Sequence, residues 1–246
     1  MSRPTEFRLP NDECRLVVIQ DQTQPCPYRE GVVARMPLRL PIGNVTPEIM
    51  DKMLAMGFRR SGDFVYRTEC PECRECQPTR VKVAEFEWTR SLRRVLKRGD
   101  RDLNCRWGHP SVDSNRVEMF NDHRQVRSLG GFDEPVDQDG YRAFLCNTCC
   151  DTRELAIYRG EKLVALSIVD VGRESTSAVY THFRPEESVY SLGTYAVLKQ
   201  IQWANETDRP FVYLGMFVAE NRHLNYKARY RHQQRFVAEQ WGDVGD

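Results

Sequence analysis

Hydrophobic and polar residues follow two different periods in the second half of the chain. Between residues 153 and 183, apolar runs broken at Gly160 and Gly172 predict three antiparallel strands, at residues 153–159, 162–171 and 176–183. Apolar residues then recur every three to four positions from Tyr195 to Ala204, which predicts a helix. The short apolar run at residues 211–215 predicts a buried strand, and a last helix is expected from Asn225.

The first half is less regular. A strand is expected at residues 16–19, and Thr46-Pro47 predicts a helix start, with Gly57 as its end. Further along, the patterns predict a hairpin at 58–67, a strand at 81–86, a helix at 92–98 ended by Gly99, and helices at 116–127 and 141–146. A meander of strands followed by βα units predicts an α+β protein with a mixed sheet. We place a domain boundary between residues 88 and 89, which divides the chain into 1–88 and 89–246.

The start of the helix near residue 192 is a candidate binding element. Ser191 is expected to cap it, and Gly193 lets another group approach the backbone closely. A helix start presents free N–H groups and the positive end of the helix dipole, which suit an anion or a developing oxyanion. The alternative is an ordinary core helix and strand.

Composition narrows the class of partner. With 246 residues, of which 40% are apolar, the chain can form one large domain or two modest ones. The formal charge is +1, so a nucleic acid would have to be held by local patches. We find no signal-like segment and no apolar run of about 18 residues, so a cytoplasmic protein is expected.

The nine cysteines are a chemical signal. Without an export signal, free thiols or a metal site are more plausible than disulfides. Cys70, Cys73 and Cys76 are spaced to converge on one ion, and Cys26 completes a set of four for zinc or an iron–sulfur cluster. Reduced structural thiols are the alternative. Cys146, Cys149 and Cys150 lack a clear fourth partner and are interpreted as thiols.

Two basic patches are candidates for phosphate binding. The first lies on one face of a helix that has no acidic residue before Asp100, and comprises Arg90, Arg93, Arg94, Lys97 and Arg98. The second places Lys227 and Arg229 between Tyr226 and Tyr230, whose rings suit stacking on a base. A solvated helix face and packed tyrosines are the alternatives. Without a recognisable nucleotide-binding or hydrolase motif, the residues alone name no reaction.

Many short motifs together resemble the arginyl-tRNA–protein transferase family, in its bacterial leucyltransferase branch. In the N-terminal half they are Pro25-Cys-Pro-Tyr, Gly57-Phe-Arg-Arg-Ser-Gly, the Cys70–Cys76 run, and the basic segment from Arg90 to Arg98. In the C-terminal half they are Ser191-Leu-Gly-Thr-Tyr, Ile201-Gln-Trp-Ala, Val212-Tyr-Leu-Gly and Asn225-Tyr-Lys-Ala-Arg-Tyr. The likeness covers nearly the whole chain.

The resemblance implies an N-degron enzyme that moves an amino acid, here leucine, from charged tRNA to the N-terminal α-amine of proteins starting with Asp or Glu. It also implies a small cysteine-containing domain followed by an acetyltransferase (GNAT)-like domain. Positions that match the donor-binding motif, and so are assigned to the aminoacyl-tRNA end, are Ser191, Gly193, Thr194, Tyr213 and Gly215. The reaction requires no cofactor.

The implied chemistry is aminolysis of an ester, which needs aligned substrates, an oxyanion site and a proton acceptor. Asp170 and Glu220 are the candidate bases. The acidic first side chain of the acceptor needs a cation, for which Arg59, Arg60 and Arg80 are candidates. The basic helix, with Lys227 and Arg229, is assigned to tRNA. Arginine as the donor, a binding module without catalysis, and an acyl-CoA-dependent acetyltransferase remain alternatives.

Overall fold

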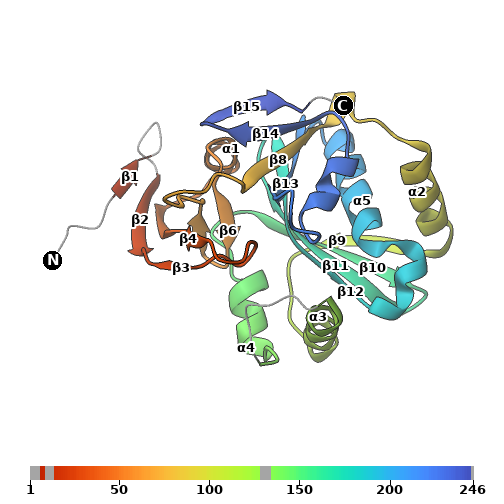
Figure 1. Ribbon diagram of the computed structural model, residues 1–246. Coiled ribbons are helices and arrows are strands. Elements are labelled where there is room, and N and C mark those ends of the chain that lie inside the picture. Colours follow the sequence, from red (N-terminus) through yellow and green to blue (C-terminus); the bar gives the residue numbers. More distant parts are fainter. Residues whose placement is uncertain (1–5, 9–13, 128–133, 245–246) are drawn as a thin grey trace.

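The computed structural model describes residues 6–8, 14–127 and 134–244. A small antiparallel sheet from the N-terminal half lies beside a larger mixed sheet (Figure 1). Within the described residues, no helix is both long enough and apolar enough to span a membrane. The α+β class with a mixed sheet, expected from the sequence, is confirmed.

The large sheet has eight strands. In spatial order they are β15 (Gln240–Asp243), β14 (Gln233–Val237), β8 (Gln77–Lys82), β13 (Phe211–Phe217), β12 (Ser175–Phe183), β11 (Lys162–Val171), β10 (Thr152–Arg159) and β9 (Asn104–Gly108). All neighbours are antiparallel except β12 and β13. Strand β8 therefore lies in the large sheet although it comes from residues 1–88, and the division at residue 88 stays a prediction.

The small sheet has five strands, in the order β1 (Glu6–Arg8), β2 (Cys14–Gln20), β5 (Leu38–Gly43), β7 (Phe64–Tyr66) and β6 (Arg59–Ser61). Strands β3 (Thr23–Pro25) and β4 (Val33–Arg35) form a separate pair. Helix α1 (Pro47–Ala55) begins where the sequence predicts, because the Thr46 side chain accepts a hydrogen bond from the Ile49 N–H. Its buried residues pack with Tyr213 of the large sheet, so the two sheets share a core.

Helices cover both faces of the large sheet. On one side α5 (Leu192–Glu206) packs against it, with α2 (Arg90–Asp102) outside (Figure 1). On the other side lie α3 (Ser114–Arg127), α4 (Gln138–Tyr141) and the π-helical turn η2 (Arg142–Cys146). The 3-10 helices are η1 (Val83–Glu85), η3 (Pro185–Tyr190) and η4 (Asn225–Arg229).

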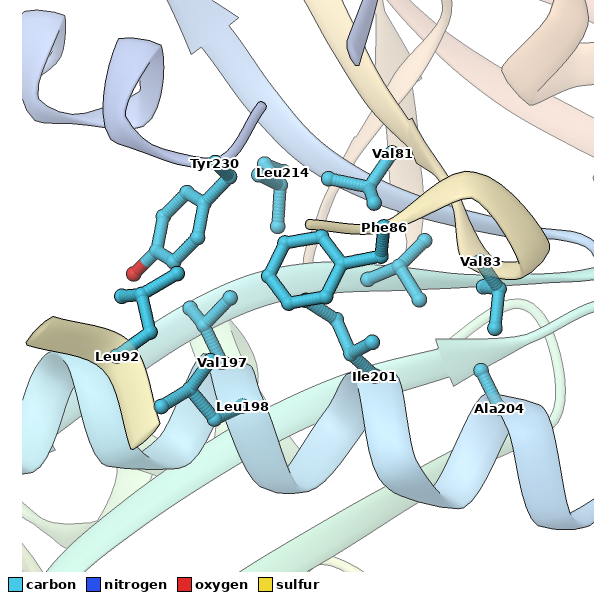
Figure 2. Packing of buried hydrophobic residues seen from close by; sticks show 11 residues of the cluster. Val81, Val83, Phe86, Leu92, Val197, Leu198, Ile201, Ala204, Leu214 and Tyr230 are labelled. Atoms are coloured by element: carbon cyan, nitrogen blue, oxygen red, sulfur yellow. The ribbon is translucent and has the colours of Figure 1, made fainter. Parts of the chain in front are cut away.

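The core between α5 and the sheet includes residues from distant parts of the chain. Val81 and Phe86 lie over Val197 and Ile201 of α5, and Tyr230 closes the end of the cluster (Figure 2). Tyr230 is fully buried, so it holds η4 close to the first turns of α5. Burial of this apolar surface is the main force that joins the two halves.

The parallel strands β12 and β13 pair over a short stretch. Their register extends from Ser175 opposite Phe211 to Ser177 opposite Tyr213. Beyond Tyr213 the ladder between them stops, while β13 continues beside β8. A bulge interrupts the β13–β8 register between Tyr213 and Gly215, and Gly215 has a φ of +82°. The ends of these strands therefore present backbone that is not paired across the sheet.

Most predicted elements are confirmed, but three details are wrong. Gly99 does not end α2; a Cβ there would lie 2.2 Å from the Tyr195 ring, so glycine allows α2 and α5 to approach closely. The strand expected at 81–86 instead spans Gln77–Lys82, and a 3-10 turn follows it. The last helix, η4, is a short 3-10 helix.

Candidate functional site

A buried arginine without an acid partner lies where the small and large sheets meet. Arg59, on β6, is 5% exposed, and its Nη1 donates to the Phe58 carbonyl at 2.6 Å. Its Nε and Nη2 atoms have no hydrogen-bond partner among the described residues. The guanidinium carbon lies 5.2 Å from the centre of the Tyr213 ring. Burial lowers the pKa of Arg59 to about 10, an effect opposed by Tyr213 and Tyr66.

A second buried cation is close to the first. Lys227, on η4, is 4% exposed, and its Nζ lies 4.8 Å from the centre of the Tyr226 ring. Burial, together with the charge of Arg59, lowers the pKa of Lys227 to about 7. Buried charges are normally paired, so these two cations, which have no carboxylate partner among the described residues, are a candidate site for an anion.

Arg80, on β8, is a third cation near Arg59. It lies opposite Tyr213 in the ladder, and its Nη1 donates to the Tyr213 hydroxyl at 3.0 Å. Its Nε donates to the side chain of Gln234 at 2.9 Å, and the rings of Phe211 and Trp241 lie on either side at 3.9 and 4.3 Å. Arg80 therefore orients Tyr213, the residue that faces Arg59.

Arg60, the third acceptor candidate, already has an acid partner. Its Nε donates to both oxygens of Asp170, at 2.8 and 2.9 Å, and both side chains are 0% exposed. Thr152 donates to the same carboxylate at 2.9 Å. The structure thus joins Arg60 to Asp170, a candidate base. This geometry favours a structural role for the pair, and their assigned roles stay predictions.

The other candidate base, Glu220, lies on the surface. Its side chain is 69% exposed, and it accepts a hydrogen bond from Arg29 Nε at 2.9 Å. It follows β13, as the sequence predicts, but an exposed carboxylate with an arginine partner is a common surface ion pair. Its assignment as a base also stays a prediction.

The first turn of α5 and η4 contact each other. Ser191 precedes the helix with a left-handed backbone, φ +52°, and its side chain makes no capping hydrogen bond, so the predicted cap is wrong. Arg229 Nη1 donates to Thr194 Oγ1 at 3.3 Å. A Cβ on Gly193 would meet the Phe183 ring at 3.3 Å, whereas one on Gly215 would meet nothing within 4 Å. Open backbone therefore remains at Gly215.

The basic side chains of α2 all face solvent, as the sequence predicts: Arg90, Arg93, Arg94, Lys97 and Arg98. Arg93 donates to the Trp88 carbonyl, and Arg98 donates to the Val189 carbonyl beside the start of α5. In the part of the chain that is described, Arg90, Arg94 and Lys97 have no hydrogen-bond or ion-pair partner. Lys227, which the sequence analysis also assigns to tRNA, is buried and is therefore not part of this exposed surface.

The four candidate metal ligands gather near the small sheet. Burial raises the pKa of the Cys76 thiol to about 12, with further contributions from Cys26, Cys70 and Cys73, so the four sulfurs are near neighbours. Within residues 6–8, 14–127 and 134–244, however, no three His, Cys, Asp or Glu side chains form a group that could hold a metal ion. Zinc or an iron–sulfur cluster stays a prediction.

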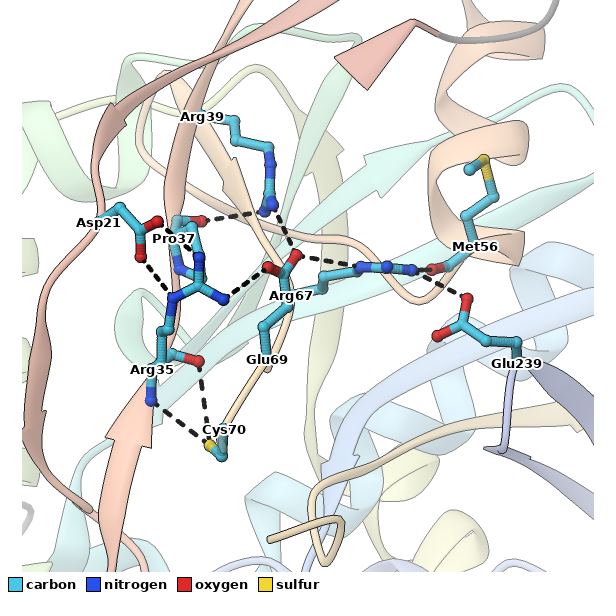
Figure 3. Close-up of polar contacts among 9 residues, drawn as sticks. All are labelled: Asp21, Arg35, Pro37, Arg39, Met56, Arg67, Glu69, Cys70 and Glu239. Carbon is cyan, nitrogen blue, oxygen red and sulfur yellow. Dashed lines mark hydrogen bonds and ion pairs between the residues drawn. The ribbon is translucent and has the colours of Figure 1, made fainter. Parts of the chain in front are cut away.

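An ion network supports the cysteine segment. Glu69 accepts hydrogen bonds from Arg35, Arg39 and Arg67 (Figure 3). The backbone N–H of Arg35 also donates to Cys70 Sγ at 3.5 Å. Glu69, the residue before the cysteine run, is therefore tied to strands β4 and β5 and to the residue that follows β7, which limits the positions that the thiols can take.

Sequence reasoning did not connect Arg59 with Lys227. It assigned the first to the acceptor and the second to tRNA, because the two residues are 168 positions apart and no local pattern links them.

 The two residues are far apart in the chain, and only the fold brings their charges near each other. The sequence offered one indication of a buried lysine, the position of Lys227 between Tyr226 and Tyr230. The same pattern is equally typical of a surface patch.

The chain is similar to known proteins along most of its length. Residues 24–94 match the family model "Arginine-tRNA-protein transferase, N terminus", and residues 115–237 match "Arginine-tRNA-protein transferase, C terminus". The chain is 34% identical over 218 residues to the "Aspartate/glutamate leucyltransferase" of Vibrio vulnificus strain YJ016, covering 88% of this chain and 92% of that protein.

Two further similarities were found. The chain is 33% identical to the protein of the same name from Acinetobacter baumannii strain ATCC 17978, covering 88% of this chain and 80% of that one. Among solved structures, the C-terminal domain of a putative lysylphosphatidylglycerol synthetase from Agrobacterium fabrum aligns with a TM-score of 0.46 and 13% identity, covering 80% of this chain and 71% of that one.

Proposed function

The chain belongs to the arginine-tRNA-protein transferase family and is an aminoacyltransferase, and we propose that it transfers leucine from leucyl-tRNA to the N-terminal α-amine of proteins that begin with Asp or Glu. The names of its relatives in Vibrio and Acinetobacter support leucine as the donor amino acid and acidic residues as the acceptors. Because charged tRNA is its substrate, we place the reaction in the cytoplasm.

The observation that carries the proposal is the buried guanidinium of Arg59. Two of its nitrogens have no partner among the described residues, although a buried donor without a partner costs about 1–3 kcal/mol. The carboxylate of an N-terminal Asp or Glu supplies two oxygens in the geometry that a guanidinium binds. An Asn or Gln side chain carries no charge and would leave the cation uncompensated.

The donor end of leucyl-tRNA is assigned to the first turn of α5. Thr194 and Arg229 meet there, and the free N–H groups of the helix start favour phosphate or a developing negative charge. The basic face of α2 lies beside α5, where Arg90, Arg94 and Lys97 are available for the phosphates of the acceptor stem. In this arrangement the first turn of α5 binds the aminoacyl ester, and α2 binds the acceptor stem of the tRNA.

The chemistry is attack of the neutral α-amine on the ester carbonyl of the leucyl group. The ester is already activated, so the enzyme accelerates the reaction chiefly by alignment and by stabilising the oxyanion. Gly215, with open space around it, provides backbone that an incoming carbonyl can approach. A group is also required to accept a proton from the amine.

A transfer assay tests the proposal. Peptides that begin with Asp, Glu, Asn or Ala are incubated with tRNA that carries labelled leucine, arginine or phenylalanine. We expect leucine to be transferred to the Asp and Glu peptides alone. Transfer of arginine to the same peptides would leave the proposed acceptors unchanged and make arginyl-tRNA the donor. If folded enzyme transfers none of the three amino acids, the chain is better explained as a binding module.

A further inference from the structure

We propose that Lys227 is the catalytic residue that accepts the proton of the acceptor's α-amine during its attack on the aminoacyl ester. The inference rests on the proposed function, since it concerns the same acceptor and donor. It replaces the role in tRNA binding that the sequence pattern assigned to Lys227. It also makes Lys227 the proton acceptor in place of the two candidate carboxylates, Asp170 and Glu220.

The position of η4 is the first argument. This 3-10 helix follows β13 and packs against it. Arg229 reaches Thr194 at the donor end, while Lys227, two residues earlier, points inward to the neighbourhood of Arg59. In an N-terminal Asp the α-amine and the side-chain carboxylate are separated by two carbon atoms. A carboxylate bound to Arg59 therefore brings the amine close to Lys227.

The second argument is that η4 is held rigidly. Gln233 Nε2 donates to the carbonyl oxygens of Lys227 and Tyr230, at 2.9 and 2.8 Å. Tyr230 is 0% exposed in the core that α5 shares with β8 and β13. A base must be positioned within hydrogen-bond reach of its proton, and these contacts fix the backbone on both sides of Lys227.

The candidate carboxylates are already engaged. Asp170 is buried with both oxygens bound to Arg60, and Glu220 is exposed and paired with Arg29. Lys227 has no carboxylate partner among the described residues. It is thus a buried titratable group next to Arg59 that is free to exchange a proton.

The surroundings of Lys227 favour its neutral form. Arg59 on β6 is the charged group that acts on it, and both this charge and burial lower its pKa, to about 7. Tyr226 on η4 contributes its ring face, and Gln233 on β14 is uncharged and bonds to the Lys227 backbone. Lysines that act as bases are usually desolvated or lie next to another cation, and Lys227 satisfies both conditions.

The step balances as follows. The neutral α-nitrogen forms a bond to the ester carbonyl carbon, and Lys227 Nζ takes a proton from that nitrogen. As the tetrahedral intermediate collapses, the bond between carbon and the ribose oxygen breaks, and the Lys227 ammonium returns the proton to that oxygen. The products are the new amide and free tRNA, and Lys227 is neutral again.

Comparison of Lys227→Arg with Lys227→Met tests the assignment. Arginine keeps a positive charge but cannot lose its proton at neutral pH, so both variants should lower kcat about 100-fold or more while the acceptor KM stays within about threefold. Lys162→Arg, on a surface lysine paired with Glu186, is the matched control and should leave the rate unchanged. Circular dichroism and thermal unfolding show that each variant is folded, and Lys227→Arg alone suffices if Lys227→Met does not fold.

The pH profile adds an independent readout. In the wild type the single-turnover rate should level off above about pH 7–8, whereas in Lys227→Arg it should keep rising with hydroxide concentration. A Lys227→Arg variant with wild-type kcat would overturn the proposal and make Lys227 a simple anion-binding cation. Failure of the proposed function is distinct, because wild-type enzyme would then transfer no leucine to Asp or Glu peptides.

Discussion

At the scale of single residues, two adjacent arginines have opposite fates. Successive side chains of a strand point to opposite sides, so Arg59 and Arg60 on β6 meet different surroundings. Arg60 is neutralised by Asp170, while Arg59 lies beside Tyr213 and has no acid partner in the part of the chain that the structure describes. The first interaction stabilises the fold, and the second is the basis of the proposed acceptor site.

Replacement of Arg59 should affect the acceptor selectively. Arg59→Met keeps most of the side-chain volume and removes the guanidinium, so the KM for Asp and Glu peptides should rise about 10-fold to 100-fold, since a hydrogen bond to a charged group contributes about 1.5–3 kcal/mol. Steady-state kinetics with varied peptide measures this. Arg173→Met, at an exposed arginine, is the control. An unchanged preference for Asp over Asn peptides would remove Arg59 from the acceptor site.

Asp170→Asn should act on stability. The change leaves Arg60 as an uncompensated buried charge, and breaking such a pair costs about 3–5 kcal/mol. Urea unfolding should show this loss, whereas Asp139→Asn, at an exposed ion pair, should change the free energy of unfolding by less than about 1 kcal/mol. Stability equal to wild type together with a large loss of kcat would instead support Asp170 as the base.

At the scale of elements, three short segments organise the site. Strand β6 carries Arg59, η4 carries Lys227 and Arg229, and the first turn of α5 carries Thr194. The close approach of α2 to α5, which Gly99 permits, places the basic surface of α2 near the start of α5. The packing around Tyr230 keeps η4 next to α5.

Charge reversal on α2 should weaken tRNA binding. In an Arg90→Glu, Arg94→Glu double variant, the slope of log K against log salt should become shallower by about 1.4–1.8, because two phosphate contacts are lost. Filter binding at several salt concentrations measures the slope. A Lys162→Glu, Arg173→Glu double variant has the same net charge and should bind like wild type. Equal slopes for all three proteins would show that α2 is only a solvated face.

At the scale of the whole molecule, the site lies at a junction. The small sheet provides Arg59 and the large sheet provides Tyr213, while β8 crosses from the first half of the chain into the larger sheet. The Arg60–Asp170 pair fastens the same junction. Both halves of the chain therefore contribute residues to the candidate site, and one family model matches in each half.

The candidate metal site also depends on the whole fold, because its four cysteines come from two separate segments of the chain. If Cys26, Cys70, Cys73 and Cys76 bind a metal, elemental analysis of purified protein should find about one zinc ion or cluster iron per chain, and Cys76→Ser should reduce that content and lower the Tm. Cys105→Ser, outside the group, is the control. Protein prepared with added metal, yet containing none, would establish these residues as reduced thiols.

The sequence by itself determined the elements and the family. Hydrophobic periodicity located β10, β11, β12 and α5, because side-chain burial in strands and helices repeats with the local geometry. Glycine and proline marked the ends of α1 and the β6–β7 turn for the same local reason. The order of short motifs indicated an aminoacyltransferase, which the family matches bear out.

Only the tertiary structure decided which charges are paired. Nothing in the local sequence distinguishes Arg59 from Arg60, and the pairing of Arg60 with Asp170 joins positions 110 residues apart. The burial of Lys227 likewise depends on the packing of η4 against β13 and on its hydrogen bond from Gln233 of β14. Local patterns record propensity and burial within one element, whereas the protonation and partners of a charged group depend on every element that surrounds it.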